Sequence, residues 1–168
     1  MGNDLNKHDV WASGDSYERY VGRWSRRVAG EFIRWLALAE NSRWLDVGCG
    51  TGALSQTILE LMNPISVTGI DRSDGFLGVA RQNVRHEKVE FRVGDASSLP
   101  VDSEMYDAAV SGLVLNFVPS PEQMVAEMKR SVCAGGTVAL YVWDYASRMQ
   151  MMRHFWNAAA ALDPRAYD

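Results

Sequence analysis

The residues with the clearest chemical potential are glycines that follow a short apolar run. Gly48, Gly50 and Gly52 alternate with small residues in the stretch WLDVGCGTG. Because glycines lack Cβ atoms, they let the backbone turn tightly and come close to a ligand. If a helix begins after the turn, its first N–H groups also face that ligand. The stretch therefore predicts a ligand-binding turn between a strand and a helix.

Asp46 lies inside the apolar run, two residues before the first glycine. A buried carboxylate without a partner is strongly destabilising or changes its pKa. We therefore expect Asp46 either to pair with a cationic ligand group or to accept hydrogen bonds from the glycine turn. The carboxylate would repel a pyrophosphate and attract an ammonium group.

Two further aspartates follow the next two apolar runs. Asp71 comes about 20 residues after the glycine turn, where a carboxylate can accept hydrogen bonds from both hydroxyl groups of a ribose. Asp95 can accept a hydrogen bond from an exocyclic amine, and the N–H of Ala96 can donate one to a ring nitrogen. The stretch GCGTGA and Asp71 also satisfy the dinucleotide fingerprint G-x-G-x-x-A, but a single match of this kind is weak.

The elements that must position these residues alternate between strand and helix. Apolar runs and helical periodicity predict strands at 43–48, 66–70, 89–93, 106–111 and 137–143, and helices at 16–39, 52–62, 74–86, 121–133 and 147–161. Most of the strands are apolar throughout, which is typical of a parallel sheet covered by helices on both faces. We therefore predict an α/β fold with a Rossmann-like, doubly wound, mainly parallel sheet of about five strands. Ligands bind such sheets beyond the carboxyl ends of the strands, where the glycines and aspartates lie.

We expect the chain to consist of two parts. Residues 1–39 would form an N-terminal arm and a helical lid, and residues 40–168 would form the sheet domain. Within that domain Ser120 and Gln123 predict a capping box at the start of a helix, and the pair Gly135-Gly136 predicts its end.

Composition and charge exclude several classes of protein. The chain has 168 residues, of which 47% are hydrophobic and 23% charged, and a net charge of −4, which is typical of one globular domain. Since there is no basic block, we expect no nucleic-acid partner. No apolar run is long enough for a membrane span, and no signal peptide is visible. Cys49 and Cys133 follow neither a metal nor a disulfide spacing, so we expect a reduced, cytoplasmic protein without a metal site.

The ordered motifs resemble those of class I S-adenosylmethionine-dependent methyltransferases, in particular the small-molecule group that includes ubiquinone and menaquinone enzymes. The stretches that carry the resemblance, over residues 40–145, are WLDVGCGTG, TGIDRS, VGDASSLP, YDAAVSGLVLNFVP and AGGTVALYVW. The resemblance implies transfer of a methyl group by in-line displacement to a small organic acceptor. The cofactor would be S-adenosylmethionine and the product S-adenosylhomocysteine.

The resemblance also implies which residues bind the cofactor. Gly48, Cys49 and Gly50 would approach its methionine part, Asp46 its ammonium group, and Asp71 its ribose hydroxyls. Contacts with the adenine are implied for Arg72, Phe76, Asp95 and Ala96. Contacts with the methionine and methyl side are implied for Ser111 and Gly112, and capping of the site for Tyr20 and Arg23.

No catalytic residue is predicted, because His8, His86 and His154 have no visible partner for a general base. The sequence after the fourth strand lacks the Asp/Asn-Pro-Pro-aromatic motif of amino-directed DNA methyltransferases, which again indicates a small-molecule acceptor. Trp143 and Tyr145 follow the fifth strand, where they either form a wall of the acceptor site or pack at the end of the sheet.

Two alternatives remain open. A nucleotide-cofactor oxidoreductase of the NAD type would share the glycine turn and Asp71, although Asp46 and the VGDA motif argue against it. A cofactor-binding domain without turnover is the second alternative, because the sheet of this family has a final strand pair for which the sequence after 143 leaves no room. We therefore expect a C-terminally shortened chain in which the fifth strand has an exposed edge. Such an edge can pair in a homodimer or be covered by the tail.

Overall fold

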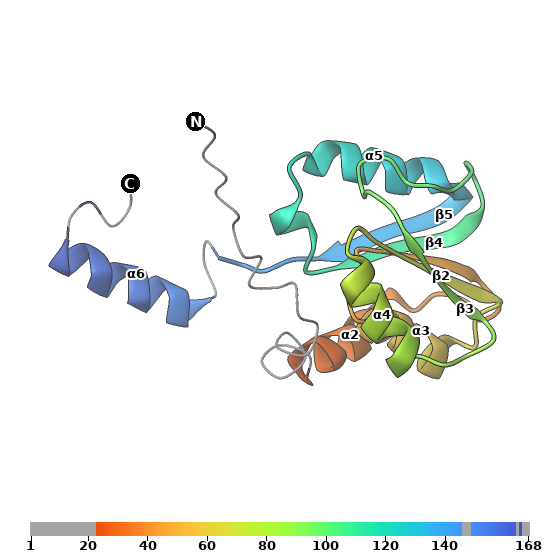
Figure 1. Cartoon of the computed structure of the whole chain (residues 1–168), viewed down its shortest axis with the longest axis horizontal. Helices are drawn as coiled ribbons and strands as arrows, with labels where there is room; N and C mark the ends of the chain where they lie inside the picture. The colour runs from red at the N-terminus through yellow and green to blue at the C-terminus, as the bar shows by residue number, and fades with distance from the viewer. Residues whose placement is uncertain (1–22, 146–148, 164, 166–168) are drawn as a thin grey trace, which may run out of the picture.

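The five predicted strands form one sheet in which every neighbouring pair is parallel. This computed structural model describes residues 23–145, 149–163 and 165. The strand order is β3-β2-β1-β4-β5 (Figure 1). The strands are β1 (Arg43–Val47), β2 (Ser66–Asp71), β3 (Val89–Val93), β4 (Tyr106–Gly112) and β5 (Val132–Tyr141). The prediction of an α/β fold with a parallel, Rossmann-like sheet is thus confirmed.

Helices cover both faces of this sheet. The helices are α2 (Arg23–Leu36), α3 (Ala53–Met62), α4 (Asp74–Asn83), α5 (Pro121–Ser131) and α6 (Gln150–Leu162), with a 3-10 turn η2 (Leu115–Phe117) after β4. In Figure 1, α5 lies on one side of the sheet and α2 and α3 lie on the other. Each crossover between parallel strands therefore passes over a face of the sheet and buries it.

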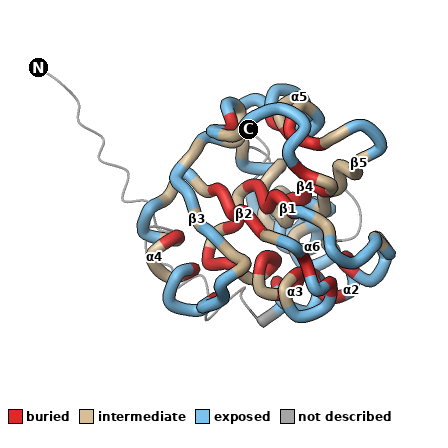
Figure 2. The backbone as a smooth tube through the Cα atoms, turned by 90° about the vertical axis from the view of Figure 1, so that its right-hand side faces the viewer, coloured by how far each residue is buried: buried red, intermediate tan, exposed pale blue. Residues whose placement is uncertain are grey.

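The central strand β1 shows how the sequence divides between two cores. Trp44 packs with α2 and α3, whereas Leu45 and Val47 pack with α5, because successive side chains of a strand point to opposite faces. All of these side chains are fully buried. Figure 2 shows the buried segments gathered in the inner strands β1, β2 and β4, while β3 is largely exposed or half-buried. The carboxyl end of β1 is therefore held rigidly in the middle of the molecule.

The ends of several elements differ from the prediction. Helix α5 ends at Ser131 and β5 begins at once with Val132, so the glycine pair lies inside the strand. Gly135 has φ 80°. The pairing of β4 with β5 changes register between Tyr106 and Ala108, and a glycine allows the backbone conformation that such an irregularity requires. The side chain of Ser120 makes no capping hydrogen bond with α5, so the predicted capping box is wrong.

The C-terminal part of the described chain lies apart from the sheet. Strand β5 pairs with β4 alone among the described strands, and α6 extends away from the body in Figure 1. Helix α6 has no buried residue in the described chain, and its Met151, Phe155 and Leu162 are exposed. No described helix is both long enough and apolar enough to cross a membrane.

Candidate cofactor site

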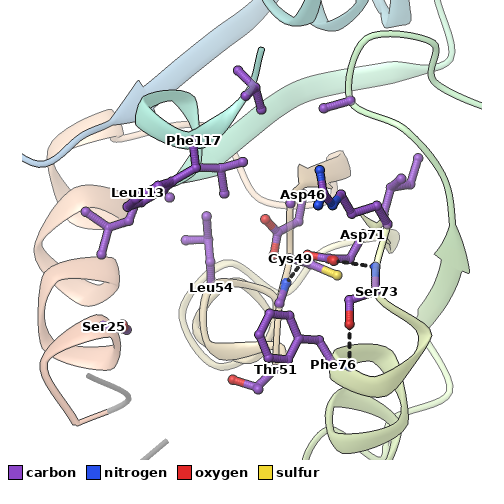
Figure 3. A pocket seen from close by; sticks show the side chains of 18 of the residues that line it. Ser25, Asp46, Cys49, Thr51, Leu54, Asp71, Ser73, Phe76, Leu113 and Phe117 are labelled. Atoms are coloured by element: carbon purple, nitrogen blue, oxygen red, sulfur yellow. Dashed lines mark hydrogen bonds between the residues drawn. The ribbon is translucent and has the colours of Figure 1, made fainter. Parts of the chain in front are cut away.

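A cavity of about 720 Å³ opens at the carboxyl ends of the strands (Figure 3). Its volume is in the range of sites for small molecules and cofactors. The predicted site residues that line it are Asp46, Gly48, Cys49, Gly50, Asp71, Arg72, Phe76, Asp95, Ala96 and Gly112. Residues from four of the five strand ends are therefore brought together in one place.

The glycine turn is fastened to the end of β2 by its own backbone. The N–H groups of Gly48 and Cys49 both donate to the carbonyl of Ile70, at 2.7 and 3.0 Å. Gly48 and Gly50 have φ values of 73° and 54°, a region that other residues rarely adopt. A Cβ on Gly48 would lie 2.5 Å from Cγ2 of Val114, whereas a Cβ on Gly50 would meet no atom within 4 Å. Gly48 is thus required for the packing of the turn, and Gly50 stands beside open space.

The carboxylate of Asp71 joins this turn to the start of α4. Its Oδ2 accepts a hydrogen bond from the N–H of Gly50, and its Oδ1 accepts one from the N–H of Ser73, both at 2.9 Å. An ionised carboxylate has about four acceptor positions. The two backbone bonds therefore fix the orientation of the carboxylate and leave further lone pairs for hydroxyl groups of a ligand.

Asp46 is fully buried and has one hydrogen-bond partner within the described part of the chain. The hydroxyl of Ser55, on α3, donates to Oδ2 at 2.6 Å, and Oδ1 has no partner among the described residues. The expectation that the glycine turn supplies the hydrogen bond is therefore wrong. Burial raises the pKa of Asp46 to about 7, and the nearby Asp71 carboxylate adds to this effect while the Ser55 bond opposes it. An orphaned buried oxygen at a cavity wall is a place where a donor group of a ligand would fit.

Asp95 and Ala96 line the cavity just after β3. One oxygen of Asp95 accepts the N–H of Ser97 at 2.7 Å, a local turn that fixes the side chain. Both residues line the cavity, so the segment presents a carboxylate and backbone groups to a ligand.

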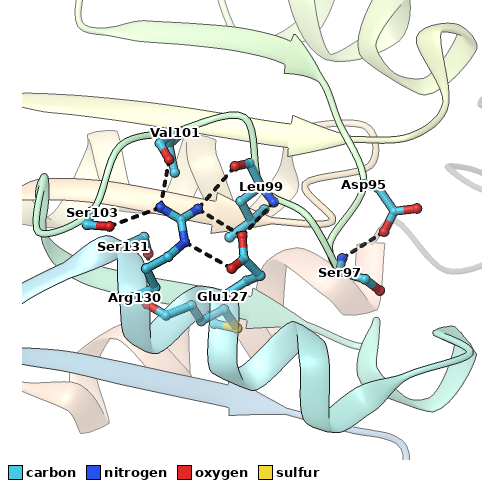
Figure 4. Close-up of polar contacts among 9 residues, drawn as sticks. Asp95, Ser97, Leu99, Val101, Ser103, Glu127, Arg130 and Ser131 are labelled. Carbon is cyan, nitrogen blue, oxygen red and sulfur yellow. Dashed lines mark hydrogen bonds and ion pairs between the residues drawn. The ribbon is translucent and has the colours of Figure 1, made fainter.

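The loop from β3 to β4, which contains Asp95, is held by an ion pair on α5 (Figure 4). The guanidinium of Arg130 donates to the carbonyls of Val101 and Leu99, at 2.9 and 3.1 Å. The carboxylate of Glu127 accepts from Arg130 at 2.8 Å and from the N–H of Leu99 at 2.9 Å. Arg130 lowers the pKa of Glu127. This clamp of Glu127 and Arg130 fixes the backbone just after the cavity wall.

Three of the predicted site residues are not seen at the cavity wall. Ser111 is buried and its hydroxyl donates to the carbonyl of Val47 at 2.7 Å, where it joins β4 to β1 and does not line the cavity. Tyr20 lies outside the described residues. Arg23 is the first residue of α2, and its side chain also lies outside the described part.

Other lining residues were not predicted as part of the site. They include Ser25, Thr51, Leu54, Leu113, Val114, Phe117 and Tyr141. Their position directly after a strand end or at a helix start could have indicated most of them. The place of Leu113 directly after β4 could also have been found in this way, whereas its φ of 63° could not, because that conformation follows from contacts of the folded chain. Neither His86 nor His154 lines the cavity, and His8 lies outside the described residues.

This order of strands, with a glycine turn after β1 and a carboxylate at the end of β2, defines a Rossmann-like domain that binds a nucleoside-containing cofactor. Residues 45–140 match the family described as methyltransferase domain, and the chain belongs to this family. The cofactor of the family is S-adenosylmethionine, and its product is S-adenosylhomocysteine. The match favours this class over the oxidoreductases that share the glycine turn.

Relatives of known activity agree with this class. The chain is 31% identical over 137 residues to the demethylmenaquinone methyltransferase of Bacillus cereus, covering 79% of this chain and 56% of that one. It is 27% identical over 150 residues to the trans-aconitate 2-methyltransferase of Variovorax paradoxus, covering 89% and 56%. The chain thus spans about half the length of the curated relatives it matches.

Solved structures show the same fold. One chain solved in complex with the Haloferax volcanii Trm112 methyltransferase activator superposes with a TM-score of 0.75. The superposition covers 86% of this chain and 65% of that one, at 21% identity. At this identity the likeness concerns the architecture alone.

The buried Asp46 predicts a pH dependence of stability. Because its pKa is about 7 in the folded chain and about 3.9 in the unfolded chain, the folded chain binds more protons between these values. The free energy of unfolding should therefore fall as the pH rises from about 4 to about 7. Asp46→Asn removes this contribution, so the stability of the variant relative to the parent should rise across that window by up to about 4 kcal/mol. Urea denaturation at constant ionic strength measures the difference; a difference that does not vary with pH would contradict it.

The glycine turn predicts unequal effects of two similar substitutions. Gly48→Ala and Gly50→Ala both place a Cβ in the left-handed region, at about 1–2 kcal/mol each. Only Gly48→Ala adds a clash, with Val114. We expect it to lower the free energy of unfolding by about 1–3 kcal/mol more than Gly50→Ala does. Chemical denaturation of both variants tests this, and equal losses would show that the turn can move away from Val114.

The clamp of Glu127 and Arg130 predicts that the loop between β3 and β4 becomes less stable when the clamp is removed. Arg130→Met keeps the apolar part of the side chain but removes the donors to the carbonyls of Leu99 and Val101. Amide hydrogen exchange over residues 97–103 should therefore become at least about tenfold faster, which corresponds to a loss of about 1.4 kcal/mol in local stability. The matched control is Lys129→Met, because Lys129 is exposed and belongs to the same helix. Mass-spectrometric hydrogen exchange measures both variants. Protection unchanged by Arg130→Met would mean that the loop is held by its other contacts.

Proposed function

We propose that this chain binds S-adenosylmethionine and transfers its methyl group to a small organic acceptor. The observation that carries the proposal is the carboxylate of Asp71, which two backbone N–H groups hold beside the glycine turn. The family to which the chain belongs and the cavity that Asp71 lines support the same function. Activity of the whole protein is part of the proposal, since the chain spans about half of its curated relatives.

The residues of the cavity fit the parts of this cofactor. Asp71 has lone pairs left for the ribose hydroxyls. The free oxygen of Asp46 would accept a hydrogen bond from the ammonium group, which would also favour the ionised carboxylate. Gly50 leaves open space beside the turn, as a close approach of the methionine part requires. We assign the adenine to Arg72, Phe76, Asp95 and Ala96.

Four of the predicted site residues have less direct support. Gly112 lines the cavity and remains assigned to the methyl side. Ser111 would act through the backbone of Val47, to which its hydroxyl donates. Tyr20 and Arg23 remain sequence predictions for the cap of the site.

The chemistry divides between cofactor and protein. Held by Asp46, Asp71 and the glycine turn, the cofactor would supply a methyl group activated by its sulfonium, with a neutral thioether as the leaving group. The residues of this chain need to hold the acceptor in line with that methyl group and to exclude water. The acceptor itself releases a proton to solvent if it carries one on the reacting atom.

The outer edge of β5 supports a proposal about assembly. No described strand pairs with this edge, and unpaired edges associate readily. We infer a homodimer through β5.

The proposed location is the cytoplasm, in keeping with the free cysteines Cys49 and Cys133.

Calorimetric titration tests the proposed function. We expect the purified chain to bind S-adenosylmethionine and S-adenosylhomocysteine in the micromolar range and not to bind NAD. Asp71→Asn should weaken binding at least about tenfold, as expected for a lost hydrogen bond to a charged acceptor. The matched control is Asp74→Asn, because Asp74 is exposed, forms an exposed ion pair with Arg81 and does not line the cavity.

Two results would overturn the proposal. One is binding of NAD without binding of the adenosyl compounds. The other is no binding of either adenosyl compound by a chain whose circular dichroism shows it to be folded. Binding without any methyl transfer to a panel of acceptors would instead favour the cofactor-binding domain without turnover.

A further inference from the structure

The cavity has two halves that differ in chemistry. The polar half consists of Asp46, Asp71, Arg72, Ser73, Asp95 and Ser97. The apolar half consists of Leu113, Val114, Phe117, Tyr141, Trp143 and Tyr145. In Figure 3, Asp46, Asp71 and Ser73 lie on one side of the opening and Leu113 and Phe117 on the other, while Ser25 lies on the side of Leu113 and Phe76 on the side of Ser73. We propose that the apolar half binds the acceptor, and that the acceptor is an uncharged molecule with an apolar, ring-sized body; this rests on the proposed function.

Strand order and register show over which strands each half of the cavity lies. Asp71 ends β2 and is in register with Val93 of β3, so the polar half lies over these two strands and the end of β1. Gly112 ends β4 and is in register with Tyr141 of β5, so the apolar half lies over the other two. Adjacent strands are about 4.8 Å apart. The glycine turn follows β1, which lies between β2 and β4. A cofactor held by Asp71 and by this turn would therefore have the apolar half on its β4 side.

The charges of the described lining residues disfavour an acidic acceptor in this half. Among the lining residues that the structure describes, every aspartate and the single arginine belong to the polar half. An ionised carboxylate buried against apolar side chains without a cation would lose its hydration and gain nothing in return. The aspartates of the other half would also repel it. A neutral acceptor meets neither penalty.

The aromatic walls of the apolar half are exposed before a ligand arrives. The ring of Phe117 is 65% exposed although it lines the cavity, and Tyr145 is 44% exposed. The rings of Trp143 and Tyr145 lie 6.5 Å apart between centroids. Large apolar surfaces that remain open at the rim of a cavity typically mark a binding site. Flat aromatic walls best fit a ligand with a flat or extended apolar body.

Hydrogen bonds hold these walls in place. The side chain of Asn116 accepts the N–H of Trp143 at 3.0 Å and donates to the carbonyl of the same residue at 3.3 Å. The N–H of Leu113 donates to the carbonyl of Tyr141 at 2.8 Å. These bonds join the segment after β4 to the segment after β5. The apolar half is therefore preorganised, which favours binding of a ligand that makes few polar contacts.

The test compares two probes with the same ring system and different charge. At neutral pH 2-naphthol is uncharged and 2-naphthoate is ionised. Both are titrated calorimetrically into the chain saturated with S-adenosylhomocysteine, and again into the chain without it. We expect 2-naphthol to bind at least about tenfold more tightly than 2-naphthoate, the ratio that 1.4 kcal/mol gives.

Variants of Phe117 locate the binding site. Phe117→Ala should weaken binding of 2-naphthol about fivefold or more while binding of S-adenosylhomocysteine stays unchanged. Phe117→Lys should shift the preference toward 2-naphthoate, because it supplies the missing cation. The matched control is Phe155→Ala on α6, since Phe155 is 61% exposed and does not line the cavity; it should change nothing.

The inference is overturned if 2-naphthoate binds as well as 2-naphthol, or if Phe117→Ala and Phe155→Ala have the same effect. A chain that binds 2-naphthol through Phe117 but fails to bind S-adenosylhomocysteine would contradict the proposed function and leave the chemistry of the apolar half established. The two failures are thus distinguishable.

Discussion

The hydrogen bonds that Asp71 accepts from Gly50 and Ser73 are the interaction on which the rest of the site depends. They join the turn after β1 to the first turn of α4, and the backbone bonds from Gly48 and Cys49 to Ile70 reinforce the same junction. With the turn fixed, α3 and α4 both start at defined positions beside the cavity. A single carboxylate thus sets the geometry of two loops and remains able to bind a ligand.

Asp71 both stabilises the site and remains able to bind a ligand, whereas Asp46 lowers stability and offers an acceptor to a ligand. The side chain of Asp46 is fully buried, and its one described partner is Ser55. Burying a carboxyl group there lowers stability, yet it leaves an acceptor oxygen at the wall of the cavity. Residues that are unfavourable for folding but suitably placed for a ligand are common at binding sites, because selection there acts on the bound state.

Much of the fold and of the polar half could be predicted from sequence, because the signals are local. Apolar runs fix the strands, and parallel sheets bring their carboxyl ends together, which brings Asp71 and Asp95 near the glycine turn. Other features depend on tertiary contacts and were missed or misjudged. The partner of Asp46 comes from α3, and Gly135 serves an irregularity in strand pairing that no local pattern reveals. The apolar half was seen only in part, since its residues have no motif beyond their place after β4 and β5.

The supports of the two halves have a consequence for how such a domain can change. The polar half is stabilised by Asp71 and by the clamp of Glu127 and Arg130, and the apolar half by Asn116 and the backbone of Tyr141. These two sets of bonds share no residue, and the two halves meet where Val114 packs against Gly48. The energetic effects of substitutions are closest to additive away from that contact, so there one half can change by successive single substitutions while the bonds that hold the other remain. Divergence in acceptor at constant cofactor is accordingly a short evolutionary path for this architecture.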